Sequence, residues 1–258
     1  MSVIDCLSYN GEIDVLKVRL AEMHELVDTV VIVECPYTFS GNKKELRFPE
    51  DKKQLEDKYL NKIKYVVFDE NDPDDDAWER EFKQKNSIFY RGVAKLMLFD
   101  DDYVVYSDLD EIPDSTTIRK YILAKSVSTV FQPHWFNFNI ENYLGPWPGH
   151  TIWLYRYADM RQWLWFKGEE ANIRNFPAKK AYPESGWHLS YFMPPEEILN
   201  KLSSYSHFND LKDLYVKEQG ISYVKNKIKA GGCLFNKFEK KVFSHPLPLY
   251  YVRQEQTS

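Results

Sequence analysis

The stretch SVIDCLSYNGEIDVLKVRLAEMHELVDTVVIVE, residues 2–34, decides the fold. Its first residues, up to about Leu7, form a short apolar run typical of a strand, and the pair Asn10-Gly11 then indicates a turn. The β-branched run TVVIV closes the stretch as a second strand. Between the two strands, apolar residues recur at helical spacing: Ile13, Leu16, Leu20, Met23 and Val27. The order strand, helix, strand predicts two parallel strands joined by a helix.

The same alternation continues along the first half of the chain. KYVVF (64–68) and DYVVYS (102–107) have the composition of buried strands, and residues 77–98 between them have helical spacing. Asp76 and Glu79 stand at the spacing of a capping box, which marks the start of that helix. We therefore expect an α/β fold, with a mostly parallel, doubly wound sheet flanked by helices.

The second half of the chain has a different character. We predict a strand at 128–132 and helices at 115–124, 194–206 and 210–229, with an aromatic-rich stretch up to Phe166. The chain contains neither an internal repeat nor a clear linker. We expect one domain over 1–258, made of two halves, about 1–127 and about 128–258.

Composition excludes several classes of protein. The 34 basic and 39 acidic residues are mixed and give a net charge of -5, which does not suit a nucleic-acid partner. The three cysteines Cys6, Cys35 and Cys233 are widely spaced, which favours a reducing compartment. No uncharged run approaches the roughly 20 residues of a transmembrane helix, and the N-terminus lacks a signal pattern. We expect a soluble, cytoplasmic protein without a transmembrane segment.

The candidate site begins where the strand at 102–107 ends, at Asp108, Asp110 and Glu111. Ligands of open α/β sheets gather at the carboxyl ends of the strands, and two neighbouring carboxylates there need a compensating charge. Mg²⁺ or Mn²⁺ would compensate them and leave positions for phosphate oxygens. The alternative is that these acids cap the next helix or lie in an exposed turn. The acidic run DENDPDDD (69–76) is interpreted as a solvated loop.

Several segments, in one order, resemble glycosyltransferase family 17. They are NGEIDVLKVRLAEMHELVDTVVIVECPYTFSG, WEREFKQKN, DDYVVYSDLDEIPD, ESGWHLSYF, KLSSYSHFND and IKAGG, and together they cover most of residues 8–232. The resemblance implies an inverting transferase that uses a nucleotide sugar, above all UDP-N-acetylglucosamine, and a glycan acceptor. It also implies a GT-A type, Rossmann-like scaffold with an Asp-x-Asp metal site, a nucleotide-sugar-binding half at 1–127 and an acceptor-binding half at 128–258.

The resemblance assigns the metal site residue by residue. Asp110 would be a direct ligand of Mn²⁺ or Mg²⁺, and Asp108 would hold the water shell of the metal or the ribose. His188, in GWHLS, would approach the metal or the diphosphate from the second half. The alternative for His188 is a structural role beside Trp187.

The resemblance also places the nucleotide. The candidate residues, besides Asp108, are Glu34, Thr38, Ser40, Glu81, Gln84, Lys85 and Asn86. The family usually has Arg where Lys85 stands, and a Lys-Pro pair where this chain has Lys44 and Glu45. Lys85 offers a point charge instead of the bidentate N–H donors of an arginine, so tight recognition of phosphate by this position is in doubt. Polarity of the helix surface is the structural alternative for the four residues from Glu81 to Asn86.

An inverting transfer needs a general base for the acceptor hydroxyl. The candidates in the second half are Glu141, Glu169, Glu170, Glu184 and Asp210, and we favour Glu170 and Asp210 because each lies near a family-like segment. The aromatic residues could form a wall against sugar rings, although each alone more often builds a core. They are Trp135, Tyr143, Trp147, Trp153, Tyr155, Trp163 and Trp165.

Two other functions remain open from the sequence. A nucleotidyltransferase or sugar-nucleotide pyrophosphorylase also uses a metal at a strand end, but it usually carries a Gly-rich, basic N-terminal loop that this chain lacks. A carbohydrate-binding protein could retain the fold without turnover.

Overall fold

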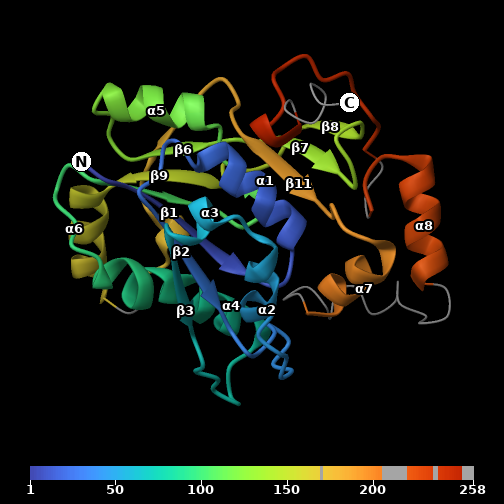
Figure 1. Ribbon diagram of the computed structural model, residues 1–258, viewed down its shortest axis with the longest axis horizontal. Coiled ribbons are helices and arrows are strands. Elements are labelled where there is room, and N and C mark those ends of the chain that lie inside the picture. The colour runs from blue at the N-terminus through green and yellow to red at the C-terminus, as the bar shows by residue number, and fades with distance from the viewer. Residues whose placement is uncertain (169–170, 205–219, 235–237, 252–258) are drawn as a thin grey trace.

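The computed structural model describes residues 1–168, 171–204, 220–234 and 238–251 (Figure 1). The strands are β1 (Val3–Tyr9), β2 (Thr29–Glu34), β3 (Ile63–Val67), β4 (Tyr103–Tyr106), β5 (Glu111–Ile112), β6 (Thr129–Phe131), β7 (His134–Asn137), β8 (Tyr143–Pro146), β9 (Ile152–Arg156), β10 (Lys179–Lys180) and β11 (Trp187–Ser190). The α-helices are α1 (Ile13–Met23), α2 (Phe48–Asp51), α3 (Asp57–Leu60), α4 (Ala77–Ser87), α5 (Ser115–Leu123), α6 (Tyr157–Lys167), α7 (Pro195–Ser204) and α8 (Gly220–Ala230). Shorter helical turns are η1 (Lys52–Gln54), η2 (Ile88–Gly92), η3 (Val93–Lys95) and η5 (Ile173–Asn175).

The larger sheet has seven strands in the order β10-β6-β9-β4-β1-β2-β3. Its centre is parallel as predicted, because β1 pairs in parallel with both β2 and β4, and β2 pairs in parallel with β3. The direction of strand order reverses at β1, with β2 and β3 on one side and β4 on the other. In open α/β sheets, ligands bind outside the carboxyl ends of the strands at such a reversal.

One strand of this sheet departs from the parallel expectation. β9 is antiparallel to both β4 and β6. The reason lies in the register, in which Phe131, the last residue of β6, faces Ile152, the first residue of β9. After forming β7 and β8, the chain re-enters the larger sheet at the carboxyl end of β6 and must therefore run back along it.

Helices cover both faces of the larger sheet (Figure 1). On one face, Leu16 of α1 and Ile118 of α5 belong to one buried core cluster. On the other face, Ile88 of η2 and Met160 of α6 belong to a second cluster. Figure 1 shows α7 and α8 at the opposite end of the molecule from α6. The mixed α/β architecture with a mostly parallel central sheet and flanking helices is confirmed.

The helix predicted at 77–98 is only partly regular. Its start is confirmed, because the Asp76 side chain accepts hydrogen bonds from the backbone of Trp78 and Glu79 while the Glu79 carboxylate accepts from Asp76 N. After α4, however, the chain continues as the π-helical η2 and the 3₁₀ turn η3. A side chain at Gly92 would collide with Val31, so the glycine allows this irregular segment to lie close against β2.

The predicted C-terminal helices are found in part. The helix predicted at 194–206 is α7, and α8 covers the end of the helix predicted at 210–229. Residues 205–219 lie outside the described part of the chain. The predicted strand at 128–132 and helix at 115–124 correspond to β6 and α5.

The smaller sheet brings β11 beside the larger one. Its order is β5-β11-β7-β8, with β11 antiparallel to β5 and parallel to β7. Gly186, just before β11, has a φ of +89°, and a Cβ there would lie 2.7 Å from the carbonyl oxygen of Ile112. Only glycine fits this close approach without strain. As a result, His188 stands directly opposite Glu111 in the register.

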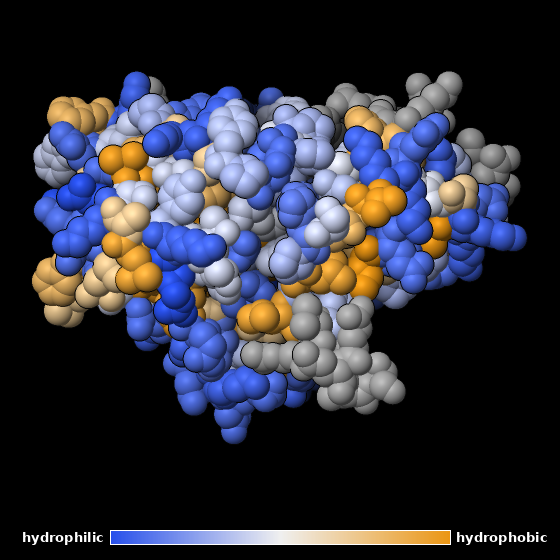
Figure 2. All heavy atoms as spheres, turned by 90° about the horizontal axis from the view of Figure 1, so that it is seen from above, coloured by the Kyte–Doolittle hydropathy of each residue, from blue (hydrophilic) through white to orange (hydrophobic). Residues whose placement is uncertain are grey.

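The surface mixes polar and apolar side chains. Figure 2 shows one face, on which hydrophobic residues form several small patches separated by hydrophilic ones. Among the residues that the structure describes, none of the helices has the length and apolarity that crossing a bilayer requires.

Candidate functional site

A cavity of about 720 Å³ opens where the carboxyl ends of the central strands meet the smaller sheet. The ends of β1 and β4 contribute Tyr9, Asn10, Asp108 and Asp110 to its lining. The smaller sheet contributes Trp135, His188 and Ser190, and α7 contributes Lys201. The site predicted after the strand at 102–107 therefore exists as a cavity, at the point where strand order reverses.

The loop that carries the acidic residues rests on a buried arginine. Arg19 of α1 is 0% exposed and binds both carboxylate oxygens of Asp5, at 2.9 and 2.7 Å. Its Nη1 also donates to Ser107 Oγ at 2.9 Å and to the carbonyl oxygens of Asp108 and Glu111 at 2.8 and 3.2 Å. A fully bonded buried guanidinium holds backbone in place, so this loop has a fixed shape.

We did not predict the role of Arg19 from the sequence, although a signal was present. Arg19 falls three residues after Leu16 and four before Met23, on the apolar stripe of the helix. An arginine on a core-facing stripe is rarely buried without a partner.

Asp108 lies between two cations. Lys85 Nζ is 3.1 Å from Asp108 Oδ2, and Arg174 Nη2 is 2.7 Å from Asp108 Oδ1. Burial alone would raise the pKa of Asp108, but Arg174 and Lys85 outweigh burial and hold that pKa well below its usual range. Asp108 is therefore ionised, and protein side chains compensate the negative charge that the sequence argument assigned to a metal.

Asp110 has its own cationic partners. Lys201 Nζ lies 2.8 Å from Asp110 Oδ2 and 2.7 Å from Glu12 Oε1, and His188 Nε2 lies 3.8 Å from the same oxygen of Asp110. Burial would raise the pKa of Asp110, but Lys201 and His188 hold it well below its usual range. Burial would lower the pKa of His188, but the Asp110 and Glu111 carboxylates outweigh burial and raise it.

Two further carboxylates are less well compensated. Burial raises the pKa of Glu12, although Lys201 opposes the shift. Burial also raises the pKa of Glu111, and the neighbouring charge of Asp108 adds to the effect. Carboxylates of both high and low proton affinity therefore lie within one cavity, an arrangement that is frequent at functional sites.

The three predicted metal ligands are not assembled as a set. Asp110 and His188 face one another, whereas Asp108 is turned toward Lys85 and Arg174. Within the described ranges, no three His, Cys, Asp or Glu side chains gather in a way that could hold a metal ion. Asp110 and His188 alone are a donor pair that suits Mn²⁺ or Mg²⁺, which keep positions for water and phosphate oxygens. Metal binding by Asp108, Asp110 and His188 stays a prediction, and Asp110 and His188 are the two of these residues that the structure brings together.

The nucleotide candidates divide into two groups. Thr38, Glu81, Gln84 and Lys85 line the cavity together with Asp108. Gln84 Nε2 donates to the carbonyl oxygen of Tyr37 at 3.1 Å, which ties α4 to the loop after β2. This loop and this helix therefore form one wall, as predicted.

The other three candidates point elsewhere, since Glu34, Ser40 and Asn86 are outside the cavity lining. The Glu34 carboxylate accepts from the backbone N–H groups of Arg47 and Phe48 at 2.6 and 3.1 Å, and thereby holds the chain ahead of α2. Ser40 Oγ lies 2.9 Å from Oγ1 of Thr38, which does line the cavity.

Asn86 connects α4 to the segment that follows residue 170. Its Nδ2 donates to the carbonyl oxygen of Ala171 at 2.7 Å, and its Oδ1 accepts from Ile173 N at 3.4 Å. These bonds place η5, and with it Arg174, beside Lys85. Sequence reasoning missed Arg174 because ANIRNF has no periodicity or motif that indicates a site.

The predicted general bases cannot be placed. Glu170 and Asp210 lie outside the described residues, as does Glu169. Glu141 and Glu184 are described but are absent from the cavity lining.

The aromatic wall is found in part. Trp135 and Trp147 line the cavity, with their rings 4.8 Å apart at 82°, and Trp147 lies 4.2 Å from the His188 ring. Tyr143, Trp153 and Tyr155 belong to the core clusters instead. Trp163 packs against the second cluster, whereas Trp165 is 85% exposed.

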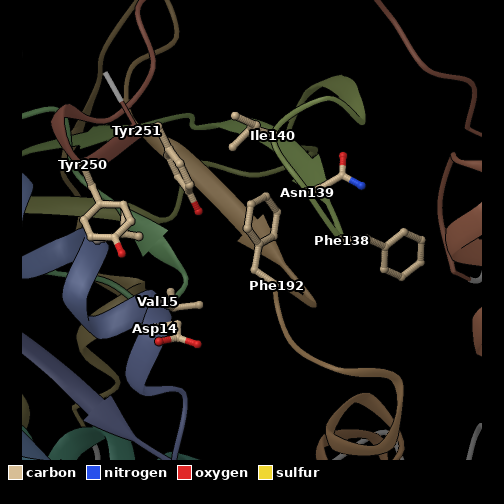
Figure 3. A pocket seen from close by; sticks show the side chains of 9 residues that line it. Asp14, Val15, Phe138, Asn139, Ile140, Phe192, Tyr250 and Tyr251 are labelled. Carbon is tan, nitrogen blue, oxygen red and sulfur yellow. The ribbon is translucent and has the colours of Figure 1, made fainter. Parts of the chain in front are cut away.

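A second, smaller cavity of about 260 Å³ lies beside α1. Figure 3 shows Asp14 and Val15 on one side of it, and Phe138, Asn139 and Ile140 from the turn after β7 on another. Phe192, Tyr250 and Tyr251 complete the labelled lining. Its carboxylate, Asp14, is 83% exposed, so this cavity lacks the buried charge of the larger one.

A mostly parallel sheet with a charged cavity at the carboxyl ends of its strands defines a ligand-binding α/β protein. The chain belongs to glycosyltransferase family 17, whose sequence profile matches residues 1–244. This match confirms the resemblance noted from the sequence.

Curated relatives carry one common name. The chain is 26% identical over 264 residues to the human β-1,4-mannosyl-glycoprotein 4-β-N-acetylglucosaminyltransferase. It is 24% identical over 263 residues to the rat protein of that name and 23% identical over 263 residues to the mouse protein. Each alignment covers 89% of this chain and 48% of the relative. The chain therefore spans about half the length of the curated relatives it matches.

Proposed function

We propose that the protein transfers N-acetylglucosamine from a uridine-diphosphate donor to a hydroxyl group of a glycan. The observation that carries the proposal is the cavity at the reversal of strand order, with Asp108 and Asp110 at the end of β4. Membership of glycosyltransferase family 17 and the names of the relatives support the choice of reaction and sugar.

In this reaction the oxygen of the acceptor hydroxyl bonds to the anomeric carbon of the sugar. The bond from that carbon to the phosphate oxygen breaks, and its electron pair leaves with the diphosphate. The proton of the hydroxyl passes to a carboxylate on the opposite face of the sugar, for which Glu170 and Asp210 remain our candidates. Such a displacement inverts the anomeric configuration.

The charged residues of the cavity suit the leaving group. Lys85, Arg174 and Lys201 place positive charge where a diphosphate develops negative charge. A Mn²⁺ or Mg²⁺ ion held by Asp110 and His188 would add Lewis-acid stabilisation of the same charge. Trp135 and Trp147 offer flat apolar faces to a sugar ring, and Trp147 lies beside His188.

A donor screen tests the proposal. The purified protein is incubated with Mn²⁺, a glycan mixture and a panel of nucleotide sugars, and free nucleotide and new glycan products are measured. We expect UDP-N-acetylglucosamine to give UDP and an extended glycan with inverted configuration. Release of pyrophosphate or of a nucleoside monophosphate would instead indicate nucleotidyl transfer.

The variant Asp110→Asn links activity to the site. Removing this charge leaves Lys201 with Glu12 as its carboxylate partner and deprives His188 of the Asp110 carboxylate, and we expect turnover to fall by about 10²- to 10³-fold. Asp101→Asn removes an exposed carboxylate that is absent from the cavity lining and should keep full activity. Calorimetry that detects no binding of any nucleotide sugar, with or without Mn²⁺, would refute the proposed function.

A further inference from the structure

Two arginines, the buried Arg19 and the partly exposed Arg174, differ in how their donors are used. Arg19 makes five hydrogen bonds to Asp5, Ser107 and two carbonyl oxygens. Arg174 is different, since its Nη2 forms an ion pair with Asp108 Oδ1 at 2.7 Å, whereas its buried Nε has no hydrogen-bond partner among the described residues. Buried donors of a native protein are nearly always bonded, so an unbonded Nε–H on a charged guanidinium indicates a partner that binds later.

Arg174 is also placed where a ligand can reach its side chain. Arg174 lines the large cavity, and its side chain is 30% exposed. Its Nη2 forms an ion pair with Asp108 Oδ1 at 2.7 Å. Among the described residues that line this cavity, Arg174 is the one arginine. It therefore provides the planar, two-pronged donor set there, whereas Lys85, Lys44 and Lys201 offer point charges.

Lys85 and Arg174 are held together by the fold. Asn86, next to Lys85 on α4, bonds Ala171 and Ile173, and Tyr155 Oη donates to the carbonyl oxygen of Ile173 at 2.9 Å. Both cations then meet on the two oxygens of Asp108. This arrangement fixes the spacing of two positive charges before any ligand arrives.

The chemistry of a matching ligand follows from this geometry. Two cations that share one carboxylate can exchange it for the oxygens of a doubly charged group, and a guanidinium prefers planar or tetrahedral oxyanions that accept two parallel hydrogen bonds. In the proposed reaction, the diphosphate of the donor is the group with that charge and shape.

We propose that Arg174 and Lys85 bind the diphosphate of the nucleotide-sugar donor, with Arg174 providing the two-pronged contact that Lys85 lacks and Asp108 holding both cations in position. The inference rests on the proposed function and assigns Arg174, from the second half of the chain, to the donor site.

Calorimetric titrations of the full chain in Mn²⁺ buffer test the inference, with UDP, inorganic pyrophosphate and uridine as probes. For Arg174→Met we expect binding of UDP and pyrophosphate to weaken about 10- to 100-fold while uridine binding is unchanged. Lys85→Met should show the same selective loss. Arg174→Lys should also lose affinity for UDP. The lysine keeps a positive charge beside Asp108 but lacks the two parallel N–H donors of the guanidinium.

Arg161→Met is the matched control. Arg161, on α6, forms an exposed ion pair with Asp100 and lies outside the cavity lining. Unchanged uridine binding by the Arg174 variants shows that they are folded. If wild type binds UDP and both Arg174 variants bind it equally well, the inference is wrong and the proposed function stands. If wild type binds neither UDP nor any nucleotide sugar, both are wrong.

Discussion

The two halves of the chain contribute different charged groups to the cavity. We call the lining residues from 1–127 the first wall and those from 128–258 the second wall. Every carboxylate in its described lining comes from residues 1–127, namely Glu12, Glu81, Asp108, Asp110 and Glu111. Residues 128–258 contribute none of the described carboxylates; they add cationic and aromatic groups, among them Trp135, Trp147, Arg174, His188 and Lys201. Neither wall is electrostatically complete alone, and ion pairs such as Arg174–Asp108 and Lys201–Asp110 join them. If the donor binds as we propose, its site takes part of its positive charge from residues 128–258.

The two walls also differ in what supports them. Beneath the first wall, Arg19 and Asp5 form a fully buried ion pair. Beneath the second, His134 of β7 is buried against His245 and Tyr143, and its burial, with the charge of His245, lowers its pKa to about 4. The first wall thus depends on buried charge, whereas the second depends on keeping a titratable group neutral.

The largest expected effect concerns the first wall. Arg19→Met leaves Asp5 as an unpaired buried charge and releases the loop at Asp108, so we expect the free energy of unfolding to fall by about 3–5 kcal/mol. Urea unfolding followed by circular dichroism measures it. The exposed-pair variant Arg161→Met should show little change. Equal stability of the two variants would mean that buried charge does not support this wall.

The next effect concerns the second wall and pH. His134 has a folded pKa of about 4 against about 6.5 in an unfolded chain, so its neutral form stabilises the fold by up to about 3 kcal/mol at neutral pH. This contribution is complete above about pH 6.5 and is lost as pH falls toward about 4. Glu184 and Asp114 oppose the shift but do not outweigh burial.

In His134→Phe, that part of the acid sensitivity should disappear. Urea midpoints measured from neutral pH down to about pH 4 should fall less steeply for the variant than for wild type. Parallel curves for the two proteins would show that His134 is not held neutral by the second wall.

The smallest expected effect concerns the aromatic surface. Trp147→Ala removes a ring from the cavity, and we expect the KM for the acceptor to rise about 3- to 10-fold with little change for the donor, since an aromatic contact contributes about 0.5–1.5 kcal/mol beyond its buried area. Trp165→Ala, at an exposed position of α6, is the control. Equal acceptor KM values for Trp147→Ala and Trp165→Ala would show that Trp147 does not contribute to acceptor binding.

The sequence could predict much of the first wall and little of the second. Strand and helix periodicity around residues 2–34 gave the parallel centre of the sheet, because local spacing determines which face is buried. The same spacing does not tell which way a side chain at a strand end points, which is why Glu34 was assigned to the nucleotide but instead bonds the chain ahead of α2. The position of Arg174 depends on bonds from Asn86 to Ala171 and Ile173, 85 and 87 positions away, and no local pattern records them.

Lys201 has a consequence for how the protein is made. Its bond to Glu12 joins residues 189 positions apart, and its bond to Asp110 joins residues 91 positions apart. A nascent chain that ends before α7 would contain both carboxylates but not the lysine that bonds them. Such an intermediate would contain every strand of the larger sheet, yet Glu12 and Asp110 would lack the lysine that joins them until the last quarter of the polypeptide had emerged.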